Sequence, residues 1–129
     1  MMCDVQYNTS EVIRMPDFEP MQNMLTELRR GSLSLAVLGS LQEPRYGYAL
    51  LQTLTEQGIE IEANTLYPLL RRLEGQELLT SDWDTSESRP RKYYVVSQKG
   101  KEALRQLMQE WEKMQKSIAA ICGKGENNG

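Results

Sequence analysis

Two groups of basic side chains lie where they could bind a polyanion. Arg71 and Arg72 are adjacent in a segment with helical periodicity, and Arg89, Arg91 and Lys92 form a second group after a polar loop. The arginine guanidinium offers several donors in one plane, which suits phosphate oxygens and guanine edges. Each group alone is also compatible with an ordinary solvated surface. Together they predict nucleic-acid binding.

The sequence offers little material for catalysis. It contains no histidine, which excludes Ser-His-Asp triads, Cys-His dyads, histidine-rich metal sites and imidazole pH switches. No nucleophile with a neighbouring base, phosphate-binding loop or metal-ligand cluster is recognisable. We therefore expect a protein that is not an enzyme and that holds no metal or cofactor.

The chain has no sequence feature of export or membrane insertion. Residues 1–10 lack the apolar core of a secretory signal, and no window approaches eighteen apolar residues. Cys3 and Cys122 lie near opposite ends of the chain, without metal-ligand or disulfide spacing. We interpret both as free thiols of a reducing compartment and expect a cytoplasmic protein without a membrane partner.

The overall charge at first argues against nucleic acid. The 129 residues, enough for one domain plus an arm or a long helix, contain 15 Lys and Arg against 18 Asp and Glu, a net charge of −3. Counted by segment, residues 1–20 carry −3, residues 21–100 carry −1 and residues 101–129 carry +1. The acidity belongs mostly to the N-terminal segment. Non-specific affinity for DNA should therefore be modest and sensitive to salt.

Hydrophobic periodicity predicts three helices that could position the first basic group. The first runs from Met21 and ends before Pro44, with Gly31 as a possible point of division, and the second covers about 46–57. The third follows the N-cap candidate Asn64 and continues to about residue 73.

Downstream the apolar period changes from 3.6 toward 2. Residues 79–83 and 92–96 read as two strands joined by the polar loop 84–90, and Ser97 can cap a last helix over about 98–121. Three helices, a hairpin and a helix predict a mainly α fold with a small β-hairpin. This is a winged helix-turn-helix with a long C-terminal helix.

We divide the chain into four parts on this basis. They are a flexible N-terminal arm (1–20), a winged helix-turn-helix DNA-binding domain (21–97), a C-terminal dimerisation helix (98–122) and a disordered tail (123–129).

Rotation by about 100° per residue separates two sides of the third helix. One side carries the expected core residues Leu66, Leu69, Leu70 and Leu73. The other carries Pro68, Arg71, Arg72 and Gly75, with Thr65 and Tyr67 on the flanks. The two arginines are thus predicted to project away from the core.

Three segments together resemble the PadR family of transcriptional regulators. They are Tyr46-Gly47-Tyr48-Ala49-Leu50, Asn64-Thr65-Leu66-Tyr67-Pro68-Leu69-Leu70-Arg71-Arg72-Leu73-Glu74 and Arg89-Pro90-Arg91-Lys92-Tyr93-Tyr94, followed by Ser97 and Gly100. The match covers about residues 21–121 in the right order and spacing. The resemblance is to small members with a single C-terminal helix that sense multiple drugs.

The resemblance implies a set of residues at or near DNA. They are Tyr46, Tyr48, Thr65 and Tyr67 near the backbone, Arg71 and Arg72 in or beside the major groove, and Arg89, Arg91 and Lys92 on the wing. For Tyr48 and Tyr67, plain packing is the alternative, and of Tyr93 and Tyr94 one ring is expected to point inward.

The chain departs from the family pattern at two places. Family members often have His and Glu where this chain has Tyr46 and Ala49, and they commonly have Gly in place of Glu77. A non-glycine residue at positive φ costs on the order of 1 kcal/mol. We therefore expect Gly75 to provide the turn.

The last helix carries an apolar stripe with alternating steps of three and four residues. It consists of Leu104, Leu107, Trp111, Met114, Ile118 and Ile121. Such a seam packs on another helix, and a two-fold dimer is the simplest way to bury it. A homodimer would also present two recognition helices to the half-sites of a palindrome. Packing against the first helix of the same chain is the alternative.

Trp111 resembles the C-terminal-helix tryptophan of the multidrug-sensing members. The resemblance implies a cavity for a small planar aromatic effector, lined by Leu28, Ser32, Ala36, Trp111 and Gln115. The alternative is that Trp111 is an ordinary core residue.

We therefore expect a dimeric transcriptional regulator that binds double-stranded DNA. A repressor of a palindromic operator, released by a planar aromatic ligand, fits best. The alternative is a winged-helix protein-interaction scaffold that does not bind DNA, which the net negative charge favours mildly.

Overall fold

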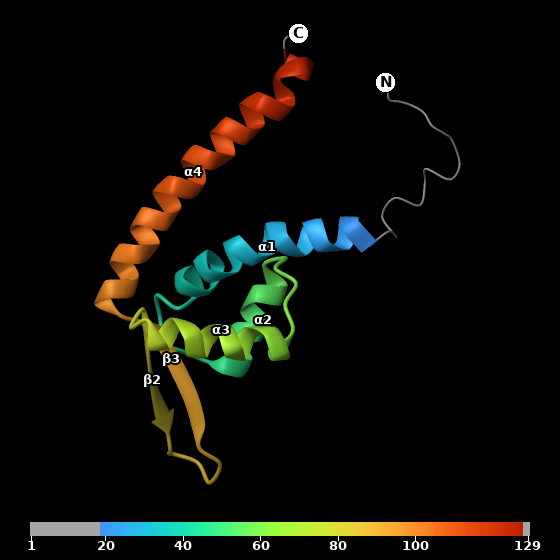
Figure 1. Ribbon diagram of the computed structural model, residues 1–129. Helices are drawn as coiled ribbons and strands as arrows, with labels where there is room; N and C mark the ends of the chain where they lie inside the picture. The colour runs from blue at the N-terminus through green and yellow to red at the C-terminus, as the bar shows by residue number, and fades with distance from the viewer. Residues whose placement is uncertain (1–18, 128–129) are drawn as a thin grey trace. The chain divides into compact units, whose positions relative to one another are not determined.

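The computed structural model describes residues 19–127 of the chain. They form four helices, α1 to α4, and one antiparallel sheet, joined by short connections (Figure 1). The elements are α1 (Glu19–Ser40), β1 (Arg45–Tyr46), α2 (Gly47–Glu56), α3 (Ala63–Gly75), β2 (Leu79–Asp84), β3 (Arg91–Val96) and α4 (Gln98–Asn127). This order confirms the predicted mainly α fold with a winged helix-turn-helix and a long last helix.

The chain divides into two compact units, residues 1–33 and residues 34–129. Within the first unit the described residues belong to α1. The second unit contains the end of α1 and all other elements. Most of the predicted arm (1–20) lies outside the described residues, but Glu19 and Pro20 already belong to α1.

Helix boundaries differ from the predictions at several points. Helix α1 is continuous through Gly31, so the predicted division there is wrong. The residue before α3 is Glu62, in an extended conformation and without a side-chain cap, so Asn64 lies inside the helix and is not its N-cap. Helix α4 continues through Gly123 to Asn127, where periodicity was expected to end. A helical glycine costs only about 1 kcal/mol relative to alanine, which a long helix tolerates.

The sheet has the strand order β1-β3-β2, with β3 antiparallel to both neighbours. Strand β1 was not predicted, because two residues are too short to show a period of two. The core beneath the sheet contains Val37 and Leu38 of α1, Leu41 just after it, Leu50 and Leu54 of α2, the four leucines of α3, and Leu79, Tyr94 and Val96 of the strands. Of the two neighbouring tyrosines of β3, Tyr94 thus points inward, as expected.

The turn between α3 and β2 depends on Glu77. Glu77 adopts a positive φ of 67°, so the prediction that Gly75 provides the turn is wrong. The backbone oxygen of Glu77 accepts a hydrogen bond from Ser97 Oγ at 2.7 Å. The same Oγ accepts one from Gly100 N at 2.9 Å, which confirms Ser97 as the cap of α4. The end of α3 and the start of α4 are therefore joined through one hydroxyl.

Glu77→Gly is expected to stabilise the protein. Glycine adopts positive φ without steric cost, so the gain should be about 1 kcal/mol in the free energy of unfolding. The exposed ion pair with Lys99, 3.4 Å long, is lost but contributes little. Urea unfolding measures the difference. Glu77→Ala is the control, because it removes the carboxylate and keeps the strain. Equal stabilities of the two variants would contradict the prediction.

Candidate nucleic-acid interface

The side of α3 that faces away from the core carries four exposed residues. Leu66, Leu69, Leu70 and Leu73 are buried. At about 100° per residue the opposite side, which we call the outer face of α3, consists of Asn64, Pro68, Arg71 and Gly75. Asn64 was missed as a candidate because it was assigned to the cap. Continuing the rotation one turn further toward the N-terminus would have found it.

Arg71 and Arg72 have different surroundings. Arg71 is exposed and forms no ion pair with any carboxylate in residues 20–123, whose side chains the structure describes. Arg72 donates from its Nη2 to Ser34 Oγ of α1 at 3.2 Å. The predicted pair is therefore split, with Arg71 on the outer face of α3 and Arg72 turned toward α1. Thr65 is exposed on the same flank as Arg72.

The tyrosines near the start of α2 also differ. The ring of Tyr67 lies over Gly47. A Cβ on Gly47 would lie 2.8 Å from both Cε1 and Oη of Tyr67. Tyr67 is half-buried, so it packs α3 on α2 with part of its side chain and leaves the rest exposed. Tyr48 is 65% exposed, so the packing alternative does not hold for it.

A cluster around Asp84 joins β1 to the hairpin. Tyr46 Oη donates a hydrogen bond to Asp84 Oδ2, while Ser86 donates to Oδ1 from N at 3.0 Å and from Oγ at 2.7 Å. The Arg91 guanidinium lies 4.2 Å from the centre of the Tyr46 ring. It is also 4.0 Å from Asp84 and 3.8 Å from Glu87. Tyr46 and Arg91, both predicted to contact DNA, thus already have partners within the protein.

The hydrogen bonds from Tyr46 and Ser86 lower the pKa of Asp84 from 3.8 to about 2. The hydrogen bond between Tyr46 and Asp84 is also the largest cause of the raised pKa of Tyr46. Because the pKa of Asp84 is lower in the folded state, the stability it contributes is present above about pH 4 and is lost as the pH falls toward about 2.

Tyr46→Phe should move the pKa of Asp84 back toward 3.8, because it removes the hydrogen bond that lowers it most. An NMR titration of the Asp84 side-chain carboxyl carbon measures the change. Tyr93→Phe is the matched control, since the Tyr93 ring meets Tyr46 edge to face at 6.2 Å but gives Asp84 no hydrogen bond. The prediction fails if both variants keep the wild-type pKa.

Lys92 lies on the other face of the hairpin from Arg91. Its Nζ is 3.8 Å from Glu74 Oε1 of α3, and 5.8 and 5.4 Å from the centres of the Trp83 and Tyr94 rings. The predicted basic group on the wing is therefore not one patch. Consecutive strand residues point to opposite faces, and acidic residues accompany both cations.

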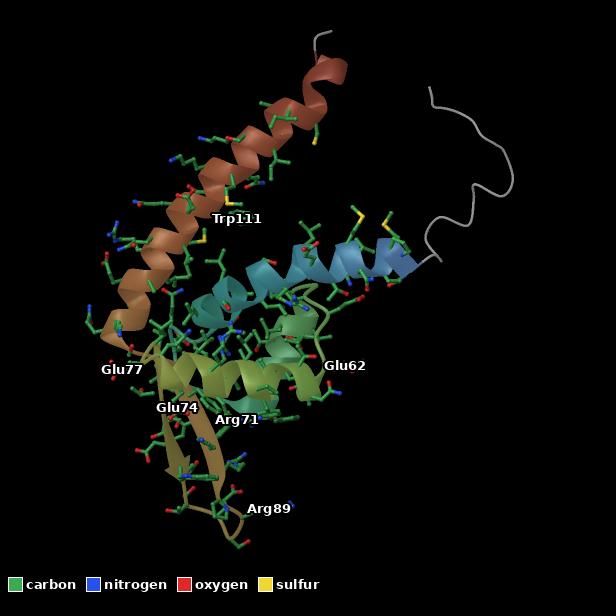
Figure 2. The ribbon with its side chains drawn as sticks, in the orientation of Figure 1. Glu62, Arg71, Glu74, Glu77, Arg89 and Trp111 are labelled. Carbon is green, nitrogen blue, oxygen red and sulfur yellow. The ribbon has the colours of Figure 1, made fainter. Side chains whose placement is uncertain are left out.

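Arg89 is exposed at the tip of the hairpin, and within the described residues it forms no ion pair (Figure 2). Of the five basic side chains predicted to contact DNA, Arg71 on the outer face of α3 and Arg89 on the wing are thus the two that form neither an ion pair nor a side-chain hydrogen bond within the described part of the chain.

The apolar stripe of α4 is largely uncovered. Leu104 is half-buried, and the exposed fractions are 41% for Leu107, 42% for Trp111, 51% for Met114, 52% for Ile118 and 73% for Ile121. Packing of this stripe within its own unit is therefore slight.

The residues assigned to an effector cavity fall in both units. Leu28, 74% exposed, and Ser32, whose Oγ donates to Arg29 O at 3.0 Å, belong to the first. Ala36 is half-buried in the second, which also contains Trp111 and the exposed Gln115.

Neither a metal site nor a membrane span is found among the described residues. No three His, Cys, Asp or Glu side chains of that part of the chain are grouped so as to hold an ion. No helix in it is long and apolar enough to cross a bilayer. Cys122 is a free, exposed thiol, and Cys3 lies outside the described residues.

Comparison with known proteins gives a consistent result. Residues 35–106 match the model of the transcriptional regulator PadR-like family. A solved PadR family transcriptional regulator from Eggerthella lenta is 45% identical, with a TM-score of 0.77 over 85% of this chain and 96% of that one. One from Clostridium difficile is 26% identical, with a TM-score of 0.66 over 71% and 99%. The transcriptional regulator Rv3488 of Mycobacterium tuberculosis is 28% identical over 81% of this chain and 99% of its own length.

Proposed function

Because the chain belongs to the PadR-like family of transcriptional regulators, which bind DNA and are not enzymes, we propose that it is a homodimeric cytoplasmic repressor of a palindromic operator. The observation that carries the proposal is the outer face of α3. Among the residues that the structure describes, Arg71 projects there without an acidic partner, next to residues too small to obstruct a groove.

The proposed contacts fall into two classes. Arg71 and Asn64 are suited to base edges, since guanidinium and amide groups form paired hydrogen bonds with them. Contacts to the phosphate backbone are assigned to Tyr46, Tyr48, Thr65, Tyr67, Arg89, Arg91 and Lys92, and Arg72 is placed beside the major groove. Of these, the exposed Tyr48 and Arg89 are supported best.

DNA binding is tested by fluorescence anisotropy with a duplex from the region upstream of the protein's own gene. Specific binding that weakens steeply with salt supports the proposal, because each neutralised phosphate releases counterions. Absence of specific binding at low salt would favour the alternative, a protein-interaction scaffold that does not bind DNA.

Dimerisation is proposed to bury the apolar stripe of α4. The support is the exposure of Trp111, Met114, Ile118 and Ile121 along one side of a 30-residue helix. A two-fold axis between two such helices would place two α3 helices for two half-sites.

Ile118→Glu is expected to raise the dissociation constant of the dimer by about tenfold or more, because it buries an unpaired carboxylate. Light scattering after size-exclusion chromatography measures it. Gln109→Glu adds the same charge on the opposite side of α4 and should leave the dimer intact. A wild-type protein that is monomeric at all concentrations would contradict the proposed assembly.

Release of the repressor by a small planar aromatic ligand is the remaining part of the proposal. Its support is Trp111, an exposed indole on the same stripe, which offers a stacking surface. Planar dyes that quench tryptophan fluorescence and also lower the affinity for DNA would support it. Dyes that leave both unchanged would count against it.

A further inference from the structure

Trp83 is a large apolar side chain that neither the core nor the stripe of α4 uses. It lies in β2 and is 57% exposed. Single exposed apolar residues are common on protein surfaces. What distinguishes Trp83 is the side of the hairpin on which it lies.

The pleat of β2 places Trp83 on the same face as Leu79 and Ser81. Leu79 is buried in the core, and Ser81 Oγ donates to Glu74 Oε2 of α3 at 2.6 Å. This face of the hairpin therefore looks toward α3. Trp83 is the next residue on it in the direction of the hairpin tip.

A cation lies beside the indole on this side. Lys92 is paired with Trp83 across β2 and β3, and its Nζ lies 5.8 Å from the ring centre. Arg71 lies one turn before Glu74 on α3, the helix that this face contacts through Ser81 and Lys92. Trp83 thus lies beside Lys92, on the face of the hairpin that looks toward the helix carrying Arg71.

A DNA strand suits this position chemically. When α3 enters a major groove and the wing tip approaches the next minor groove, the sugar-phosphate strand between the grooves passes along this face. Deoxyribose presents C–H groups to an aromatic ring, and the phosphate accepts hydrogen bonds. No acceptor among residues 19–127 takes the indole N–H of Trp83, so this donor is free.

We propose that Trp83 is a DNA-contact residue, with its ring against a deoxyribose and its Nε1–H directed to a phosphate oxygen between the recognition helix and the wing. The inference rests on the proposed function and adds to it an apolar contact to the backbone. An apolar contact releases no counterions. Its loss should therefore lower affinity without changing the salt dependence, whereas loss of a cation changes both.

The test is a set of anisotropy titrations of the full-length protein across a range of salt concentrations, with the duplex described above. Trp83→Ala should weaken binding about tenfold at every salt concentration, with the slope of log K against log salt unchanged. Trp83→Phe, which keeps a ring but loses the N–H, should fall between Trp83→Ala and wild type. Arg89→Gln should instead reduce the slope by about 0.9. Thr80→Ala, on the same strand but the opposite face, is the matched control, and thermal unfolding verifies that all variants are folded.

The outcomes separate this inference from the proposed function. A wild-type protein that does not bind DNA overturns both. If wild type binds DNA and both Trp83→Ala and Trp83→Phe bind it as tightly as wild type, only the contact by Trp83 is overturned. The contact is also overturned if Trp83→Ala reduces the slope of log K against log salt as much as Arg89→Gln does, because Trp83 would then act by orienting Lys92. Should Trp83→Ala fail to fold, Trp83→Phe decides by the same criteria.

Discussion

Arg71→Glu is expected to abolish specific DNA binding, with a loss of affinity of more than about a hundredfold. A correct contact between arginine and a base contributes about 1–3 kcal/mol of discrimination, and a tenfold change in affinity corresponds to about 1.4 kcal/mol. Reversal of the charge adds repulsion between the new carboxylate and the phosphates. Anisotropy with the upstream duplex, at low and at moderate salt, measures the loss.

The structure provides the reason to expect more from Arg71 than from its neighbours. Arg91 lies 4.0 Å from the carboxylate of Asp84, and Lys92 lies 3.8 Å from that of Glu74. Arg72 donates a hydrogen bond to Ser34 of α1. Transfer of these cations to phosphate would cost existing interactions. Arg71 has no acidic partner within the described residues, so no ion pair is lost when it binds.

Lys116→Glu is the matched control for Arg71→Glu. It makes the same change in net charge, on an exposed part of α4 opposite the apolar stripe. It should reduce affinity only slightly, through the general field of the protein. A loss as large as that of Arg71→Glu would mean that net charge, and not the outer face of α3, determines binding. Arg89→Glu should lie between the two, since a wing contact to the backbone carries less specificity.

The order of the elements could be predicted because it depends on local periodicity. The leucines of α3 repeat at the helical spacing, and the residues of β3 alternate between faces, so both elements were found within two residues of their observed bounds. Strand β1 forms only because Arg45 and Tyr46 pair with Tyr94 and Tyr93, far along the chain. No local pattern contains that information.

The candidate site was predicted less completely, because the state of each cation depends on distant carboxylates. Asp84 of β2 lies opposite Arg91 of β3 in the hairpin. Glu74, the partner of Lys92, lies in α3. A sequence shows the cations of a wing as neighbours. Only the register and the packing of α3 reveal that acidic residues accompany them on opposite faces.

Gly100→Ala is expected to destabilise the protein more than any other substitution considered. A Cβ at this position would lie 2.0 Å from Leu78 O and 2.6 Å from Val96 Cγ2. The first is a backbone atom, which no change of side-chain rotamer can move away. Overpacking against side chains usually costs about 1–3 kcal/mol, so we expect about 3 kcal/mol or more here. The melting temperature should fall by roughly 10 °C or more.

The cost is large because the atom that would be displaced has a second role. Leu78 O also accepts the hydrogen bond from Ser97 N at 3.0 Å, immediately before α4. Relief of the clash therefore breaks a backbone hydrogen bond and moves the first turn of α4 off the sheet. Gly123→Ala, in the same helix but with open space around its Cβ, is the control and should stabilise by up to about 1 kcal/mol. A melting temperature of Gly100→Ala equal to that of wild type would show that α4 does not start against Leu78.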